Sequence, residues 1–113
     1  MRVSVIVPIY NAEAYIEKCA ESLMMQTYAD IEYIVVDGDS RDNTMNIVNS
    51  YAPKFEGRMK IVSEKDNGIY DAMNKGIAIA TGDVVGFLNS ETSYLRFLRN
   101  YGIEHRDTEI QRA

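Results

Sequence analysis

Residues 64–89, with the sequence EKDNGIYDAMNKGIAIATGDVVGFLN, decide the fold class of this chain. A polar segment ends at Gly68, and apolar residues then recur at the spacing of one helix face. Gly82 is placed to end this helix as its C′ residue, and an apolar run follows over residues 84–88. The stretch therefore predicts a helix and then a buried strand, with polar residues where each of them begins.

The same alternation of strand and helix occurs earlier in the chain. A β-branched run from Val3 to Val7 is typical of a strand buried on both faces, and Asn11 is expected to cap the helix after it. Further strands are expected at Tyr33 to Val36 and at Met59 to Val62, with a helix between them over residues 42–51. This order predicts a Rossmann-like α/β fold, a doubly wound parallel sheet with flanking helices.

Composition excludes several classes of protein. The 113-residue chain has a formal net charge of −5, which argues against nucleic-acid binding because phosphate recognition usually needs a basic surplus. Its single cysteine, Cys19, excludes an intramolecular disulfide and fits a reducing compartment. No apolar run approaches the roughly 20 residues of a transmembrane helix. We expect a cytoplasmic protein, or one held peripherally at the inner face of a membrane.

Polar residues follow each expected strand, where parallel sheets usually bind their ligands. The clusters are Tyr10 and Asn11, then Asp37, Asp39 and Ser40, then Glu64, Asp66 and Asn67, and last Asn89, Ser90 and Glu91. Neither G-x-G-x-x-G nor G-x-x-x-x-G-K-[ST] occurs, which argues against a dinucleotide-binding dehydrogenase and a P-loop NTPase. The sequence predicts a ligand site of another kind at this edge.

Three segments resemble family 2 glycosyltransferases, which have the GT-A fold. They are VSVIVPIYNAEAYIEKCAESLMMQTY, IEYIVVDGDSRDNT and SEKDNGIYDAMNKGIAIATGDVVGFLNS, and the resemblance covers residues 2–90. The last is similar to a sub-group with a D-x-G-I-Y-D-A-M-N-K-G segment. The resemblance implies transfer of a sugar from a nucleoside-diphosphate sugar to an acceptor, in glycan or cell-surface polysaccharide biosynthesis, with inversion.

The resemblance also implies the residues that hold the donor. Pro8 and Tyr10 match a loop that packs on the nucleotide base, which an aromatic ring favours by stacking. Asp37 matches an acid that accepts hydrogen bonds from the base, and Gly38 stands where the family often has a second Asp. The other implied donor-binding residues are Asn11, Asp66, Gly68, Asp71 and Asn89.

The family binds a divalent cation, Mn²⁺ or Mg²⁺, through an acidic pair just after the fourth strand, which neutralises the leaving diphosphate. This chain has Asn89-Ser90-Glu91-Thr92 there. Glu91 matches one acid and is the candidate metal ligand. Thr92 replaces the other acid, and a hydroxyl is a weaker ligand for a hard cation, so the cation site is expected to be weakened.

Residues 91–113 do not match the family and are expected to be an atypical tail on a nucleotide-sugar-binding half over residues 1–90. Apolar spacing predicts a short amphipathic helix over 94–101, and a disordered stretch is expected after Gly102. We expect the fold to be truncated after the fourth strand, with the catalytic general base in the missing half. Apolar surface exposed in this way would favour self-association.

Other interpretations of the same residues stay open. Asp39 and Ser40 are read as turn and cap residues, and Asp71 with Lys75 as a surface i,i+4 pair. Asp66 is as consistent with capping the next helix as with ligand contact. At the level of function, the alternatives to a transferase are a non-catalytic nucleotide-binding module or inactive fragment, and a protein that docks onto a partner.

Overall fold

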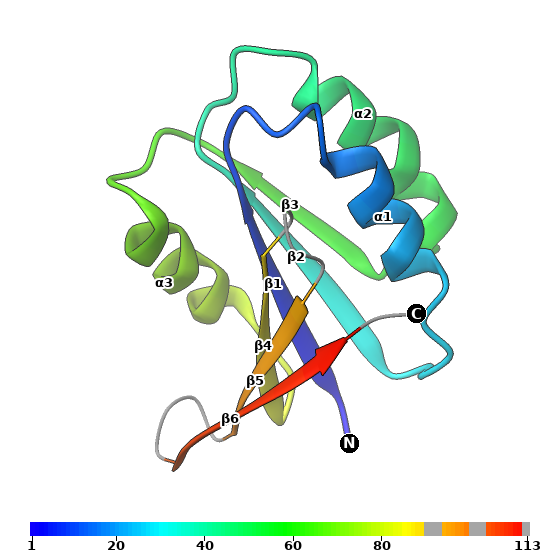
Figure 1. Cartoon of the computed structure of the whole chain (residues 1–113), viewed down its shortest axis with the longest axis vertical. Coiled ribbons are helices and arrows are strands. Elements are labelled where there is room, and N and C mark those ends of the chain that lie inside the picture. The colour runs from blue at the N-terminus through cyan, green and yellow to red at the C-terminus, as the bar shows by residue number, and fades with distance from the viewer. Residues whose placement is uncertain (90–93, 100–103, 112–113) are drawn as a thin grey trace.

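The computed structural model describes residues 1–89, 94–99 and 104–111 as one sheet with helices on both faces (Figure 1). The strands and helices follow the expected order from the first residues to β4. They are β1 (Val3–Ile9), α1 (Ile16–Met24), β2 (Ile31–Asp37), α2 (Thr44–Tyr51), the 3₁₀ helix η1 (Ala52–Phe55), β3 (Met59–Ser63), α3 (Ile69–Ile79) and β4 (Val84–Asn89).

The sheet has the order β3-β2-β1-β4-β5-β6. The first four strands are parallel, with Val3 of β1 opposite Ile31 of β2 and Val84 of β4. The predicted α/β fold with a parallel sheet and flanking helices is confirmed. Strand order reverses beside β1, since β2 and β3 lie on one side of it and β4 on the other.

Two more strands extend the sheet, and they correct two predictions. The expected helix over residues 94–101 is instead β5 (Tyr94–Arg99), antiparallel to β4, and the stretch expected to be disordered contains β6 (Glu104–Gln111). Pairing with β4 satisfies backbone groups that an edge strand would leave open, and aromatic residues favour strands. The domain boundary expected after residue 90 lies outside the described residues.

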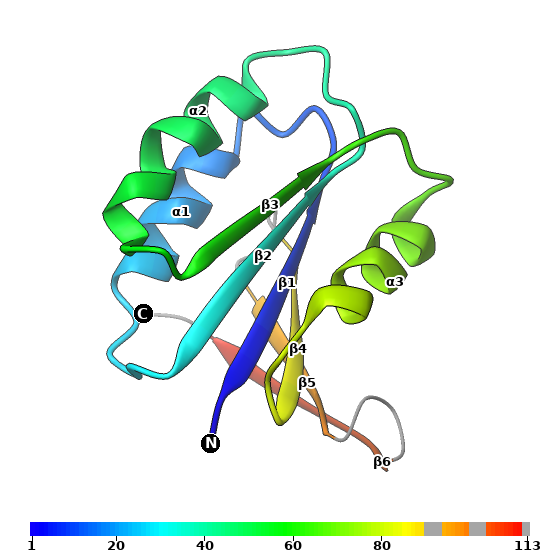
Figure 2. The same ribbon diagram turned by 180° about the vertical axis from the view of Figure 1, so that it is seen from behind.

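The helices form two layers. Helices α1 and α2 lie on one side of the sheet and α3 lies on the other, as the two opposite views show (Figures 1 and 2). Successive residues of β1 serve both layers: Val5 and Val7 belong to the core cluster under α1 and α2, and Ile6 to the cluster under α3. Strands buried on both faces have to be apolar throughout, which explains the β-branched runs.

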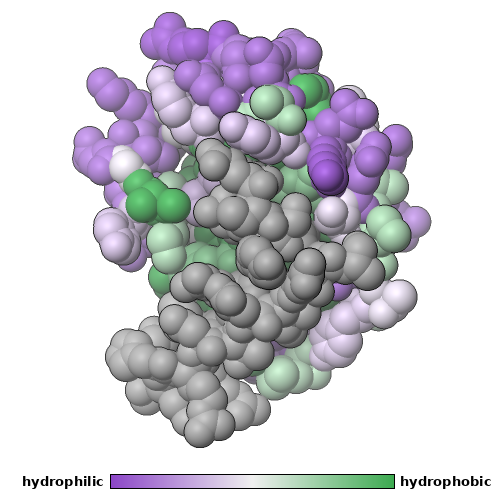
Figure 3. Space-filling model, in the orientation of Figure 1, coloured by the Kyte–Doolittle hydropathy of each residue, from purple (hydrophilic) through white to green (hydrophobic). Residues whose placement is uncertain are grey.

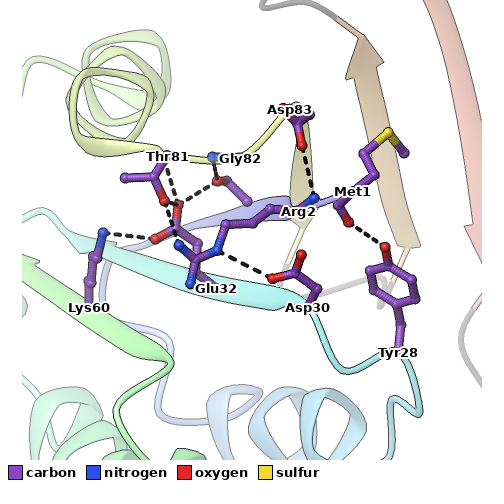
Figure 4. Close-up of polar contacts among 10 residues, drawn as sticks. Met1, Arg2, Tyr28, Asp30, Glu32, Lys60, Thr81, Gly82 and Asp83 are labelled. Carbon is purple, nitrogen blue, oxygen red and sulfur yellow. Dashed lines mark hydrogen bonds and ion pairs between the residues drawn. The ribbon is translucent and has the colours of Figure 1, made fainter.

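A buried polar network holds the amino ends of the strands together (Figure 4). Glu32 of β2 is 2% exposed and accepts hydrogen bonds from Ser4 Oγ at 2.5 Å and from Thr81 N at 2.6 Å. Its second carboxylate oxygen lies 2.8 Å from Nζ of Lys60 on β3. These contacts join three strands to the turn after α3.

Gly82 also lies at this edge, but it does not have the helix-ending role predicted from the sequence. Helix α3 ends at Ile79, so Gly82 lies in the following turn and does not act as the helix C′ residue. Its N–H donates to Ser4 Oγ at 2.8 Å, and a Cβ at this position would lie 2.8 Å from Ser4 N and 2.9 Å from Arg2 O. The glycine is needed because the turn passes directly against β1.

No helix in the described part of the chain is long and apolar enough to cross a membrane.

Candidate functional site

The carboxyl ends of the four parallel strands meet at one edge of the sheet. These ends are Ile9, Asp37, Ser63 and Asn89, and the loops after them carry the predicted polar clusters. Hydrophilic residues gather over this edge at the top of the molecule (Figure 3). Strand order reverses beside β1 at the same edge, which is where open α/β sheets bind ligands.

An open cleft lies between the end of β1 and the start of α3. It has a volume of about 210 Å³ and is lined by Pro8, Ile9, Tyr10, Asp66, Gly68, Ile69 and Ala72. Four predicted site residues, Pro8, Tyr10, Asp66 and Gly68, therefore come together in one wall. The side chain of Tyr10 is 61% exposed, so its ring is available to a ligand. Sequence reasoning missed Ile69 and Ala72, although both belong to the apolar stripe of α3.

Asp37 lies beside this cleft, but hydrogen bonds within the chain occupy both of its carboxylate oxygens. The residue is 0% exposed. One oxygen accepts from Ser40 Oγ, and the other accepts from Ser40 N at 3.0 Å and from Ser63 Oγ at 2.8 Å. Ser63 was missed as a partner, although it ends a strand at the same edge. In this arrangement Asp37 joins the loop after β2 to the end of β3.

Asp66 differs because only one of its oxygens has a hydrogen-bond partner in the described structure. Oδ1 accepts from Gly68 N at 3.1 Å. Oδ2 lies over Gly38, where a Cβ would be only 2.8 Å from it. The space that a second acid at position 38 would need is therefore filled by Asp66. The cap predicted for Asp66 is not formed, because Gly68 is the N-cap residue of α3 and no side chain caps the helix. Asp66 instead forms a turn onto Gly68 N, and its Oδ2 has no hydrogen-bond partner in the described structure.

Asp71 is absent from the residues that line this cleft. Its Oδ2 accepts a hydrogen bond from Asn67 N at 3.0 Å and lies 3.6 Å from Lys75 Nζ. The expected i,i+4 pair with Lys75 is thus present. Lys75 also ion-pairs with Glu64 at 3.3 Å, and the two acids raise the pKa of its ammonium although burial opposes this shift. Asp71 contacts the loop before α3, which in turn carries Asp66.

Asn11 also joins two loops, and it does not cap α1, which begins at Ile16. The N–H of Asn11 donates to Ser40 Oγ at 2.8 Å, and its Oδ1 accepts from Arg41 N at 2.8 Å. Its φ of 47° lies in the left-handed region, as does the φ of 69° at Asp39. Such backbone conformations cost energy in residues other than glycine and often occur at functional sites.

The remaining predicted residues belong to the end of β4 and the segment after it. Asn89 is the last residue of β4 and therefore lies at the same edge. Glu91 and Thr92, the residues on which the metal prediction rests, lie outside the described residues. Within the described ranges, no three His, Cys, Asp or Glu side chains gather as metal ligands.

Comparison with known proteins agrees with this fold. Residues 4–96 match the family model described as glycosyl transferase family 2. A "PGL/p-HBAD biosynthesis glycosyltransferase" from Mycobacterium bovis (strain BCG / Pasteur 1173P2) is 41% identical over 90 residues, which is 80% of this chain and 35% of that protein. "Uncharacterized glycosyltransferase EpsJ" of Bacillus subtilis (strain 168) is 39% identical over 79% of this chain and 26% of its own length.

Solved structures give the same result. The mannosyltransferase PcManGT from Pyrobaculum calidifontis, in complex with GDP-Man and Mn²⁺, is 32% identical with a TM-score of 0.75, covering 80% of this chain and 27% of that one. S. aureus TarS 1-349 in complex with UDP-GlcNAc is 34% identical with a TM-score of 0.71, covering the same shares. The chain thus spans about a third or less of the length of these relatives.

Proposed function

Because the chain belongs to glycosyl transferase family 2, we propose that it forms the nucleotide-sugar-binding part of a glycosyltransferase. The reaction would transfer a sugar from a nucleoside-diphosphate sugar to an acceptor in glycan or cell-surface polysaccharide biosynthesis, with inversion. The observation that carries the proposal is the cleft between Tyr10 and Asp66, at the sheet edge where strand order reverses.

The size of the cleft indicates which part of the donor it accommodates. Its volume of about 210 Å³ is below the roughly 300–1,000 Å³ of pockets for drug-sized ligands. We infer that it takes the nucleobase, with Tyr10 stacking on the ring and Pro8 packing beside it. The sugar diphosphate would then extend toward the end of β4 at Asn89, and Glu91 comes two residues later in the sequence.

Asp66 is the acid that we assign to the base. Its free Oδ2 can accept an N–H from the ligand, and a hydrogen bond to a charged group contributes about 1.5–3 kcal/mol. Asp37, whose oxygens are already occupied, would act on the base only by holding the loop after β2. Gly68, the residue before α3, would form part of the wall of the cleft, while Asn11 and Asp71 would support the loops around it.

We also propose that a divalent cation binds together with the diphosphate of the donor. The structures of PcManGT and TarS were solved with GDP-Man and Mn²⁺ and with UDP-GlcNAc, respectively. A cation, Mn²⁺ or Mg²⁺, supplies charge that neutralises a leaving diphosphate. Glu91 remains its predicted ligand in this chain.

We further propose a cytoplasmic location or a peripheral one at a membrane. We also propose self-association through exposed apolar residues such as Tyr70, which is 80% exposed.

Isothermal titration calorimetry with UDP, GDP, UDP-GlcNAc and GDP-Man, each with and without Mn²⁺, tests the proposal. We expect the chain to bind one nucleotide class, and Asp66→Asn and Tyr10→Ala each to weaken binding about tenfold or more, as loss of a charged hydrogen bond or a stacked ring predicts. Asp30→Asn, at the opposite edge of the sheet, is the matched control. Absence of binding by the folded wild-type chain would contradict the proposal.

A further inference from the structure

Two side chains of α3 hold the loop that carries Asp66, and the first of them is Lys75. Nζ of Lys75 donates to the main-chain oxygen of Lys65 at 2.9 Å and ion-pairs with Glu64 at 3.3 Å and with Asp71 at 3.6 Å. An ammonium group has three donors, and here three acceptors surround it. Lys75 therefore holds the loop on the side that precedes Asp66.

A second contact holds the loop on the other side of Asp66. Asp71, one helical turn before Lys75, accepts a hydrogen bond from Asn67 N at 3.0 Å. Because Lys75 and Asp71 also contact each other, the residues before and after Asp66 are attached to one small group of charges on α3. The carboxylate between them then reaches Gly68 N with one oxygen and the space over Gly38 with the other.

The environment of Lys75 is unlike that of a solvated surface pair. The side chain of Lys75 is only 22% exposed. The lysine of an isolated i,i+4 pair is usually well exposed to solvent, and such a pair contributes only ~0.3–0.5 kcal/mol. Glu64 and Asp71 raise the pKa of the ammonium, so Lys75 stays charged at neutral pH. Lys75 is thus a partly buried, charged side chain with three acceptors around its nitrogen, and these contacts constrain the geometry of the loop.

We propose that Lys75 is a positioning residue of the nucleotide site: it fixes the loop over residues 64–68 so that the free oxygen of Asp66 faces the cleft. This inference rests on the proposed function, because it assigns Lys75 a role in nucleotide binding. Lys75 acts through Asp66 and makes no contact with the ligand. A guanidinium is planar and cannot reproduce the arrangement of three acceptors around one nitrogen, so the site is specific for lysine.

The first test measures UDP and GDP affinity for a double-mutant cycle on the full chain. Lys75→Met keeps most of the length of the side chain and removes its charge, and we expect it to weaken binding about tenfold, as Asp66→Asn does. If Lys75 acts only through Asp66, the double variant binds no more weakly than Asp66→Asn alone. Lys18→Met, on the exposed face of α1, loses the same charge and should bind like the wild type.

An additive loss, about a hundredfold in the double variant, would overturn the inference, because it would mean that the Lys75 charge attracts the phosphates directly. A Lys75→Met affinity equal to that of the wild type would also overturn it. Lack of binding by the wild-type chain would instead overturn the proposed function itself.

A second measurement needs no nucleotide. Amide hydrogen exchange at Asn67 and Gly68 reports on the hydrogen bonds that hold the loop. In Lys75→Met we expect exchange at these two amides to accelerate about tenfold, while amides of β1 and β2 keep their rates. Unchanged exchange at both amides would overturn the positioning role alone, whereas faster exchange throughout the sheet would show a general loss of stability and would also contradict it.

Discussion

The two ends of β2 carry one buried carboxylate each, and the two serve different purposes. Glu32 lies at the amino edge of the sheet and Asp37 at the carboxyl edge, and they are 2% and 0% exposed. Glu32 is held by Ser4, Thr81 and the cation of Lys60, so its partners come from the strands on either side and from a turn. Asp37 is held by Ser40 and Ser63, which both belong to the loop edge.

The difference is in what each carboxylate leaves for a ligand. At the amino edge the network is closed and the turn at Gly82 packs directly on β1, so this edge serves stability. At the carboxyl edge Asp37 joins the loops, and a second acid, Asp66, retains a free oxygen beside an open cleft. The two non-glycine residues with positive φ near the ligand edge, Asn11 and Asp39, add backbone strain there. Substitutions at the two edges should therefore separate stability from binding.

The largest effect should come from Glu32→Gln. The amide retains the shape of the side chain but loses the ion pair with Lys60. Whichever way the amide is turned, its N–H groups face another donor, either Lys60 Nζ or Thr81 N. Hydrogen bonds to charged groups contribute about 1.5–3 kcal/mol each, and breaking a buried pair costs about 3–5 kcal/mol. Since Lys60 is partly exposed, we expect a loss of about 3 kcal/mol in the free energy of unfolding, measured by urea denaturation at pH 7.

Glu17→Gln, on the exposed face of α1, is the matched control and should change the free energy of unfolding by less than about 0.5 kcal/mol. If Glu32→Gln were as stable as this control, the closed network would not be what stabilises the amino edge.

A somewhat smaller effect is expected on acidification. Hydrogen bonds from Lys60, Ser4 and Thr81 outweigh the effect of burial and lower the pKa of Glu32 from 4.5 to about 2. Because the pKa is lower in the folded state, the stabilisation is complete above pH 4.5 and is lost as pH falls through 2. Between pH 7 and pH 3, the difference in the free energy of unfolding between the wild type and Glu32→Gln should fall by about 2 kcal/mol.

The measurement is urea denaturation of both proteins at several pH values, so that other carboxyl groups titrate equally in each. A stability difference that stays constant down to pH 2 would show that the charge of Glu32 does not act as described.

Gly82→Ala should have the next largest effect. The added Cβ would lie 2.8 Å from Ser4 N and 2.9 Å from Arg2 O, and main-chain atoms of β1 cannot move away easily. Overpacking of this kind typically costs about 1–3 kcal/mol, and we expect about 1–2 kcal/mol in thermal or urea unfolding. Nucleotide affinity should be unchanged in the folded variant because the cleft lies at the other edge; a change in affinity would mean that the two edges are coupled.

Local patterns account for the parts of this structure that could be predicted from the sequence. Strands β1 to β4 and helix α3 were predicted because a β-branched run or an apolar stripe indicates its own element. The helix expected over residues 94–101 was wrong because its few residues fit either period, and the open edge of β4 decides between them. Gly82 was assigned to a helix end since its true neighbour, Ser4, lies 78 residues away.

The predicted site shows the same limit. A motif match placed Asp37, Asp66 and Asp71 together in a donor site, and all three do lie at or beside the carboxyl edge. Which of their oxygens are already occupied depends on Ser40, Ser63, Asn67 and Gly68, whose hydrogen bonds form only after the loops meet. The order of the motifs does not contain that information.

Gly38→Ala should have the smallest effect on stability and still impair the carboxyl edge. Gly38 has no positive φ, so alanine adds no backbone strain, and the atom it would meet is the end of a side chain, Asp66 Oδ2 at 2.8 Å. That carboxylate can rotate away, which should keep the loss of unfolding free energy below about 1 kcal/mol. Rotation removes the free oxygen from the cleft, so UDP or GDP affinity measured by calorimetry should fall about threefold to tenfold.

Gly57→Ala is the control with the opposite expected result, a loss of stability without a change in nucleotide affinity. Nothing lies within 4 Å of its added Cβ, but its φ of 84° strains any other residue. It should lower stability by about 1 kcal/mol and leave affinity unchanged. Combining Gly38→Ala with Asp66→Asn should cause no further loss of affinity, since both act on the same oxygen. If Gly38→Ala bound nucleotide as tightly as the wild type, Asp66 would not be the acid that contacts the base.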